Sequence, residues 1–187
     1  MKLIRTLSLL VLAGTALVAS AEQKLVPAQS EIAFVSKQMG VPVEGRFKTF
    51  DAQIAFDPAK PQTSKIAFTV DTGSATLGVP STDAELPKPE WFGVAKFPKA
   101  TFQSTAVKAL GGGKFEVAGK LTIKGNSQDV VAPVQLTAAG AQTVAAGSFN
   151  IKRLAFKIGE GEWSDTSMVA DDVVVKFKLA LTGVGKF

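Results

Sequence analysis

The chain has 187 residues, 21 of them basic and 16 acidic, and it contains no histidine, cysteine or tyrosine. The lack of histidine and cysteine excludes Ser-His-Asp and Cys-His catalysis, disulfide bonds and ordinary zinc or copper sites. The basic excess is small and dispersed, which argues against nucleic-acid binding, because nucleic-acid-binding surfaces cluster Lys and Arg. We therefore expect a protein that is not an enzyme and that holds no metal or cofactor.

The first 21 residues have the pattern of a secretory signal peptide. Two basic residues precede an apolar run over residues 7–18, and Ala19-Ser20-Ala21 provides a small-residue cleavage site. The apolar run is too short to span a bilayer. We expect cleavage before Glu22, export of the chain, and a single domain over residues 22–187.

Strand patterns dominate the rest of the chain. Period-two alternation of apolar and polar residues, typical of half-buried strands, predicts eight strands, over residues 31–37, 43–56, 65–71, 100–107, 114–123, 130–136, 145–151 and 173–181. Eight short antiparallel strands can close into a barrel, whose interior either fills with side chains or holds one small ligand. The fold class predicted from these patterns is therefore all-β, an eight-stranded antiparallel barrel.

Residues 72–99, between the third and fourth predicted strands, break the pattern. Ser81-Thr82-Asp83 predicts the cap of a short helical connection over residues 84–86, which Pro87 interrupts. An aromatic segment, residues 90–104, follows it. A loop this rich in aromatic residues either plugs one end of the barrel or lines an entrance, and the usual position of ligand sites at barrel mouths favours the entrance.

Six blocks of the sequence resemble the YceI-like family and occur in the family's order: SEIAF (30–34), VEGRFKTFDAQIAFDP (43–58), IAFTVDTGS (66–74), KFPKATFQS (96–104), FEVAGKLTIKG (115–125) and FNIKRLAFKIGEGEW (149–163). Together they cover nearly all of the chain after residue 21. The resemblance implies a lipocalin-like barrel in the periplasm that binds a polyisoprenoid lipid or an isoprenoid quinone in an interior tunnel. The sequence departs from the family pattern at Ala155 and Lys157, where an acidic residue and a glycine are usual.

A dry tunnel for a hydrocarbon requires apolar side chains, because each unpaired hydroxyl or amide facing it costs roughly 1 to 3 kcal/mol. Thirteen Phe, two Trp and no Tyr meet that requirement. Alternation and the resemblance together identify candidate ligand-binding residues in the interior: Phe34, Phe47, Phe68, Phe102, Val117, Leu121, Phe149, Val175 and Phe177. Ile32 and Leu179 lie on the same faces. Trp91, Phe92 and Phe97 are the candidates at the entrance. The same side chains would equally fill an ordinary packed core.

Two further residues have two interpretations each. Arg153 either donates hydrogen bonds to a quinone carbonyl or lipid phosphate at the mouth, or pairs with an acidic residue such as Glu160, Glu162 or Asp165. Trp163 either closes the end of the barrel or contacts the tail of the ligand.

Two functions follow from these patterns. The first is periplasmic binding, transport or storage of an isoprenoid, with transient contact with a membrane. The second is an interaction protein with a packed barrel, whose loop 159–163 docks an inner-membrane electron-transfer partner through Trp163. An exposed barrel edge would also allow a homodimer, although the outward-facing Lys176 and Lys178 disfavour that pairing.

Overall fold

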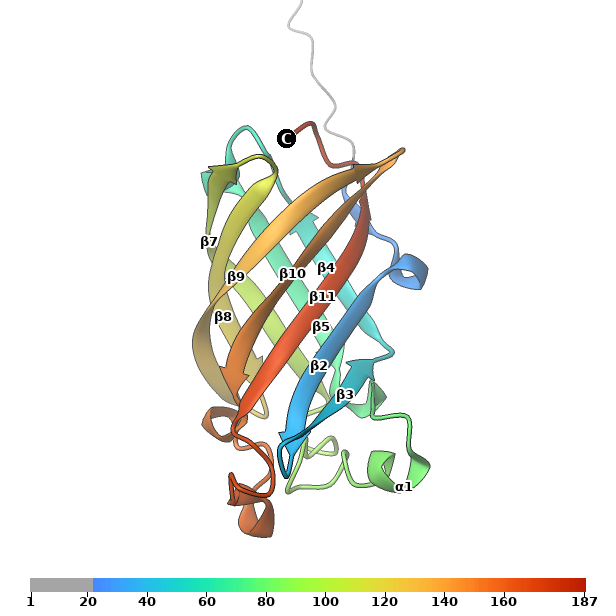
Figure 1. The fold of residues 1–187 in the computed structure, drawn as a ribbon. Coiled ribbons are helices and arrows are strands. Elements are labelled where there is room, and N and C mark those ends of the chain that lie inside the picture. Colours follow the sequence, from blue (N-terminus) through green and yellow to red (C-terminus); the bar gives the residue numbers. More distant parts are fainter. Residues whose placement is uncertain (1–21) are drawn as a thin grey trace, which may run out of the picture.

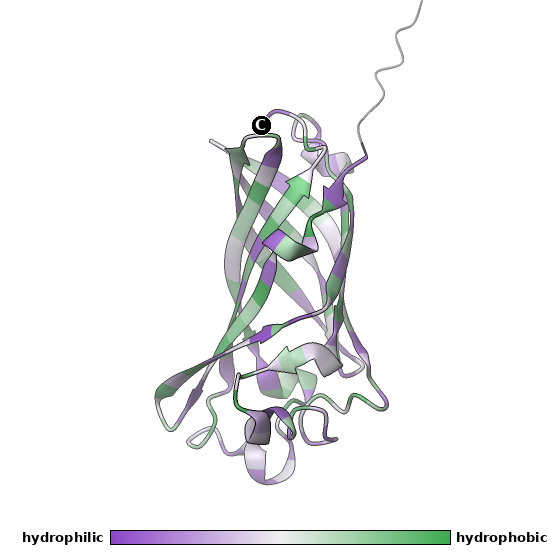
Figure 2. Cartoon of the chain, turned by 90° about the vertical axis from the view of Figure 1, so that its right-hand side faces the viewer, coloured by the Kyte–Doolittle hydropathy of each residue, from purple (hydrophilic) through white to green (hydrophobic). Residues whose placement is uncertain are grey.

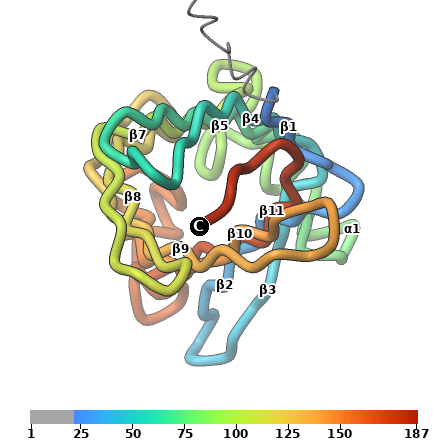
Figure 3. Tube along the Cα trace, turned by 90° about the horizontal axis from the view of Figure 1, so that it is seen from above, coloured from blue at the N-terminus to red at the C-terminus, as the bar shows by residue number. Residues whose placement is uncertain are grey.

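The structure is a computed structural model and describes residues 22–187, so the predicted signal peptide lies outside the described residues. Strand pairing in this part of the chain builds one large antiparallel sheet, with little helix. The sheet curls around a central axis (Figure 1), and a view along that axis shows the strands arranged in a ring (Figure 3).

The strands are β1 Lys24–Leu25, β2 Glu31–Gln38, β3 Val41–Phe47, β4 Phe50–Ala55, β5 Lys65–Asp71, β6 Ala75–Thr76, β7 Lys99–Gly111, β8 Lys114–Ile123, β9 Asn126–Ala139, β10 Gln142–Lys152 and β11 Asp172–Thr182. One α-helical turn, α1, spans Pro80–Asp83, and the 3₁₀ turns are η1 Pro27–Gln29, η2 Pro61–Thr63, η3 Thr72–Ser74, η4 Arg153–Phe156 and η5 Gly161–Ser164. Purple and green alternate along the strands, as expected for strands with one face buried (Figure 2).

The order of strands in the sheet corrects the predicted count of eight. The order is β4-β5-β7-β8-β9-β10-β11-β2-β3-β6, with β1 added beside β11. The segment 43–56, predicted as one strand, divides at Lys48-Thr49: β3 pairs with β2 and β6, whereas β4 pairs with β5. One alternating run of sequence therefore forms strands at both ends of the sheet. Period-two alternation does not show where the chain bends between them.

The two ends of the sheet approach each other without forming a regular strand pair, so the predicted closure is only partly realised. Beside β1, the side chain of Gln23 takes the place of a paired strand. The backbone amide of Phe56, just beyond β4, donates to Oε1 of Gln23 at 2.7 Å, and the Gln23 amide donates back to the Phe56 carbonyl at 2.5 Å. This reciprocal pair ties the β4 end of the sheet to the strands around β11.

The predicted helical connection is displaced in the structure. The α-helical turn α1 begins at Pro80, where the missing proline N–H removes no helical hydrogen bond. The predicted cap residues 81–83 therefore lie inside the turn, and the expectation of a helix over residues 84–86 is wrong. Asp83 instead holds the preceding loop, because its carboxylate accepts hydrogen bonds from the Thr76 hydroxyl (2.5 Å) and the Leu77 amide (2.6 Å).

These hydrogen bonds, first that from Thr76 and then that from Leu77, lower the pKa of Asp83 below its ordinary value of 3.8. A folded-state pKa below the unfolded one means that the contribution is complete above the unfolded value and is lost as pH falls through the folded one. We expect the stability of Asp83→Asn to respond less to acid than that of the wild type, because asparagine does not titrate. Urea midpoints between about pH 6 and pH 2.5 measure this, and parallel curves for the two proteins would contradict it.

Three strand glycines decide where the phenylalanine rings lie. Gly45 is the cross-strand partner of Phe34, and Gly147 is that of Phe177. A Cβ built on either glycine would collide with its partner's ring, and one on Gly119 would collide with the ring of Phe102. Each ring thus lies over a glycine of the neighbouring strand, against the wall of the sheet, and this arrangement leaves space along the axis.

The Phe34–Gly45 pair gives a direct test of this packing. Gly45→Ala should lower the free energy of unfolding by about 1 to 3 kcal/mol, because the new methyl group overpacks the ring of Phe34. Adding Phe34→Leu should recover part of that loss, since leucine has no ring over residue 45. Urea unfolding of both single variants and the double variant forms the cycle, and strictly additive losses would show that the two residues do not compete for space.

Candidate functional site

The described residues line an apolar cavity of about 160 Å³, which we call the upper cavity. All of its lining side chains are Ala, Val, Ile, Leu or Phe. The predicted interior residues that line it are Ile32, Phe68, Phe102, Val117, Leu121, Phe149, Val175, Phe177 and Leu179. The interior of the sheet is therefore not completely filled by its own side chains.

A second cavity, of about 400 Å³, lies nearer the end of the sheet that carries α1 and η5, and we call it the lower cavity. The predicted residues that line it are Phe34, Phe47, Trp91, Phe92, Arg153 and Trp163. Val175 lines both cavities, so they adjoin inside the sheet. Unlike the upper cavity, the lower one also has polar side chains in its wall, namely Ser36, Gln38, Ser81, Thr82 and Glu85.

Aromatic side chains form one wall of the lower cavity. The ring centroids of Phe34 and Phe47 are 5.5 Å apart, and Phe47 meets Phe92 edge to face at 5.8 Å. Trp91 and Trp163 also pack together, with centroids 5.5 Å apart. Both tryptophans thus lie at the cavity, and they contact each other across two loops that are far apart in the sequence.

The backbone around Glu90 explains how these loops meet. The Glu90 carbonyl accepts hydrogen bonds from the amides of Gly159 (2.7 Å) and Glu160 (3.0 Å). On the other side of the second loop, the buried ammonium of Lys124 donates to the Glu160 carboxylate at 2.8 Å. This hydrogen bond from Lys124 is the main cause of a lowered pKa for Glu160. The loop that carries Trp163 is consequently fixed from both sides.

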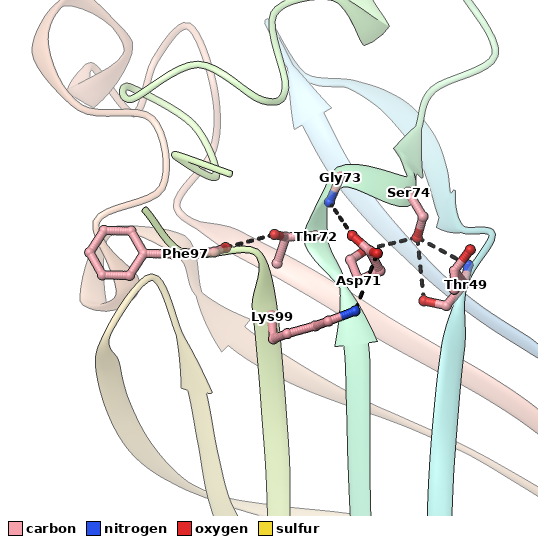
Figure 4. Close-up of polar contacts among 7 residues, drawn as sticks. All are labelled: Thr49, Asp71, Thr72, Gly73, Ser74, Phe97 and Lys99. Atoms are coloured by element: carbon pink, nitrogen blue, oxygen red, sulfur yellow. Dashed lines mark hydrogen bonds and ion pairs between the residues drawn. The ribbon is translucent and has the colours of Figure 1, made fainter. Parts of the chain in front are cut away.

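Phe97 lies apart from the residues that line the two cavities. The buried Thr72 donates from its hydroxyl to the Phe97 carbonyl at 2.8 Å (Figure 4). The ring of Phe97 packs near Gly93 and Gly125, and the ammonium of Lys96 lies 5.3 Å from its centroid. Phe97 therefore anchors the aromatic loop to the sheet in this structure, rather than lining the entrance with Trp91 and Phe92.

The polar contacts of Figure 4 hold the same end of β5. The Asp71 carboxylate accepts from the Gly73 amide at 2.9 Å and pairs with Lys99 at 3.3 Å. The Ser74 hydroxyl donates to the Asp71 carbonyl at 2.7 Å and accepts from the Thr49 amide at 3.0 Å. These bonds join β4, β5 and β7 where the chain leaves the sheet for the loops around the lower cavity.

Arg153 satisfies neither of its two predicted interpretations. Its side chain is only 2 % exposed, and all five of its hydrogen bonds go to backbone carbonyls. The acceptors are Ile158, Gly159, Trp163, Val169 and Ala170, at 2.7 to 3.1 Å. Burial lowers the pKa of the guanidinium, and the nearby Asp171 opposes that effect. Because a guanidinium has five N–H donors, none is left for a ligand head group.

At the opposite end, the C-terminal segment lies against the apolar cluster around the upper cavity. Val184 packs against the apolar cluster around that cavity, and the C-terminus lies near the centre of the ring of strands when the molecule is viewed from above (Figure 3). Phe56 and Phe115 also meet edge to face in this cluster, with centroids 5.1 Å apart. The lower cavity, beside the two tryptophans, lies at the end of the sheet where the sequence predicts the entrance.

The sequence patterns missed three kinds of lining residue. The alanines Ala132 and Ala145 line the upper cavity, but alanine gives no clear signal in a period-two pattern. The polar residues of the lower cavity come from the end of β2, from α1 and from the loop after it, where side-chain directions depend on tertiary structure. Other missed residues, such as Ile66 and Phe115, share the apolar alternation of predicted neighbours, so the same pattern could have identified them.

No helix in residues 22–187 is long and apolar enough to cross a membrane. Within the same range, no group of three or more His, Cys, Asp or Glu side chains is arranged to hold a metal ion.

An antiparallel sheet curled around an apolar interior, with aromatic loops at one end, defines an all-β protein with an internal cavity. Residues 23–181 match the YceI-like domain, and the chain belongs to this family. It is 44% identical to BcnA of Burkholderia cenocepacia, whose crystal structure aligns with a TM-score of 0.81 over 84% of this chain and 99% of that one.

More distant relatives agree with this assignment. The UPF0312 protein of Ectopseudomonas mendocina (strain ymp) is 37% identical over 87 residues, which are 46% of each chain. The chain thus spans about half the length of such curated relatives. A polyisoprenoid binding domain from Saccharophagus degradans has the same fold, with a TM-score of 0.68 at 17% identity over 86% of this chain and 98% of that one.

Proposed function

We propose that the protein binds an isoprenoid lipid or an isoprenoid quinone in its apolar interior, and that it carries or stores this ligand in the periplasm. The observation that carries the proposal is the pair of adjoining cavities, one wholly apolar and one with a mixed lining. A hydrocarbon tail matches the upper cavity, and a small polar head matches the lower one. Membership of the YceI-like family and the fold shared with a polyisoprenoid binding domain support the same ligand class.

The energetics suit a carrier. Each buried CH₂ contributes roughly 0.8 kcal/mol, so a five-carbon isoprene unit contributes on the order of 4 kcal/mol relative to water. The same tail is equally well shielded in a bilayer, so the net free energy of moving it from membrane to protein is small. Such a protein protects the tail from water and still exchanges it with membranes.

The proposal includes an architecture and a compartment. The sheet acts as a lipocalin-like barrel, with Gln23 and Phe56 joining its ends where strand pairing is incomplete. Export depends on the predicted signal peptide, residues 1–21. The protein has no catalytic role, requires no cofactor and does not bind nucleic acid. The Asp171 carboxylate accepts a hydrogen bond from the Leu154 amide and so supports η4.

The cavities favour the carrier over an interaction protein with a packed barrel. That alternative requires Trp163 as a free anchor for an electron-transfer partner. Trp163 instead packs on Trp91, and its carbonyl accepts a hydrogen bond from Arg153. Its indole is therefore already engaged within the protein.

Extraction of the native protein tests the proposal. The full chain is expressed with its signal peptide, purified from the periplasm without detergent, and extracted with organic solvent for mass spectrometry. We expect an isoprenoid at near-stoichiometric amounts, and none from an unrelated periplasmic protein purified in parallel. An empty protein that also fails to take up a quinone with a four-unit isoprenoid tail would overturn the proposal.

A further inference from the structure

Three exposed apolar side chains gather at the tip of the β2–β3 hairpin and on the loop beside it. Met39, Val41 and Met168 are 73%, 63% and 46% exposed. The Met39 amide donates to the Met168 carbonyl at 2.8 Å, and Gln38 forms an isolated bridge with Val169. We call Met39, Val41 and Met168 the apolar tip.

The apolar tip adjoins the lower cavity. Gln38 and Val169, the sequence neighbours of Met39 and Met168, both line that cavity. The hairpin projects outward from the ring of strands (Figure 3), at the same end of the molecule as α1 (Figure 1). Val79, a further exposed apolar residue, directly precedes α1 at this end. A surface that contacts the apolar tip is therefore also close to the candidate entrance.

The apolar tip and the residues next to it carry no charged side chain, and the exposed Lys37 and Asp165 flank these segments. Residues 38–43 read Gln-Met-Gly-Val-Pro-Val and residues 166–170 read Thr-Ser-Met-Val-Ala. These segments can therefore enter an apolar medium without moving one of their own charges out of water, a step that costs much free energy.

The backbone conformation of Met39 is a second feature that sets the apolar tip apart. Met39 and Gly40 occupy the turn with φ values of 47° and 79°, a left-handed pair of the kind found in tight hairpins. Asn, Asp and Gly are preferred in such turns, and a methionine is strained there. The side chain of Met39 is 73% exposed and so gains little from internal packing. A strained position with an exposed apolar residue points to a role outside the folded chain.

We infer that the apolar tip inserts its side chains into an uncharged lipid surface and thereby holds the mouth of the lower cavity at a membrane. The inference rests on the proposed function, because the ligand of such a cavity resides in membranes. A lipid surface is favoured over a protein because the tip has no Trp, Tyr or Arg, the side chains that usually anchor protein interfaces. Flexible methionine and small valine adapt to a surface without a fixed shape.

The test is flotation of the full-length mature protein with phosphatidylcholine vesicles. The variant Met39→Asn with Met168→Ser removes two of the three tip side chains, and asparagine suits the turn geometry, so the fold is preserved or stabilised. The control variant, Leu110→Asn with Val131→Ser, removes two comparably exposed apolar side chains that lie on β7 and β9, away from the tip. We expect the tip variant to float roughly tenfold less than the wild type, a difference of about 1.4 kcal/mol in binding. The control should float as the wild type does.

Three outcomes would overturn the inference: a wild type that does not float, a tip variant that floats equally well, or a control that loses flotation to the same extent. A wild-type dimer that the tip variant dissociates, without vesicle binding, would also overturn it and assign the tip to a second copy of the chain. The isoprenoid content of the same preparations separates the role of the tip from the proposed function. If the tip variant loses flotation but the wild type contains no isoprenoid, only the proposed function is contradicted. If the tip variant floats as well as the wild type and the wild type contains isoprenoid, only the role of the tip is contradicted.

Discussion

Replacing Arg153 with methionine is expected to lower the free energy of unfolding by roughly 3 to 5 kcal/mol, because it leaves buried polar groups without partners. Five backbone carbonyls from three stretches of the chain accept hydrogen bonds from this one guanidinium. Methionine has a similar length but donates nothing to them. Urea unfolding followed by tryptophan fluorescence measures the change, since Trp163 lies in the same loop.

Two variants separate this role from simpler explanations. Lys152→Met removes the neighbouring positive charge, whose ion pair with Asp172 is exposed, and we expect the midpoint of unfolding to stay unchanged. Arg153→Lys keeps the charge but supplies only three donors, so its stability should lie between those of the wild type and the methionine variant. An Arg153→Met protein with wild-type stability and reduced ligand content would show instead that Arg153 serves the ligand.

Filling the upper cavity at Ala145 should reduce the isoprenoid content of the purified protein about tenfold, a loss of ~1.4 kcal/mol in binding. Ala145 lies on β10 opposite Leu179, and both residues line that cavity. In Ala145→Phe the new ring occupies space that a hydrocarbon tail would need. Solvent extraction and mass spectrometry of the purified variant give the ratio of isoprenoid to protein.

The matched control is Ala146→Phe. Ala146 is the next residue on β10 and, by strand alternation, points to the opposite face. Its variant should retain the wild-type isoprenoid content. Thermal unfolding of both variants checks that each is folded, since overpacking alone costs about 1 to 3 kcal/mol. Equal isoprenoid contents in the two variants would exclude the upper cavity as the place of the tail.

Much of the interior could be predicted from the sequence. The predicted strand residues, from Ile32 on β2 to Leu179 on β11, line one or other cavity, because alternation determines the face of a strand on which each side chain lies. The division of segment 43–56 into two strands escaped prediction, because both halves keep an alternating pattern. Phe97 was predicted at the entrance from its neighbours in the sequence, whereas Thr72 holds its backbone elsewhere.

The family and the all-β class are determined by the sequence alone, since local alternation and six ordered blocks are enough for both. Whether the aromatic side chains filled the interior or left it hollow was decided only by tertiary structure. Rings such as those of Phe34 and Phe177 lie over glycines of neighbouring strands, and the guanidinium of Arg153 finds its acceptors only when three stretches of backbone converge. These arrangements depend on cross-strand register and loop packing, and no local pattern encodes either one.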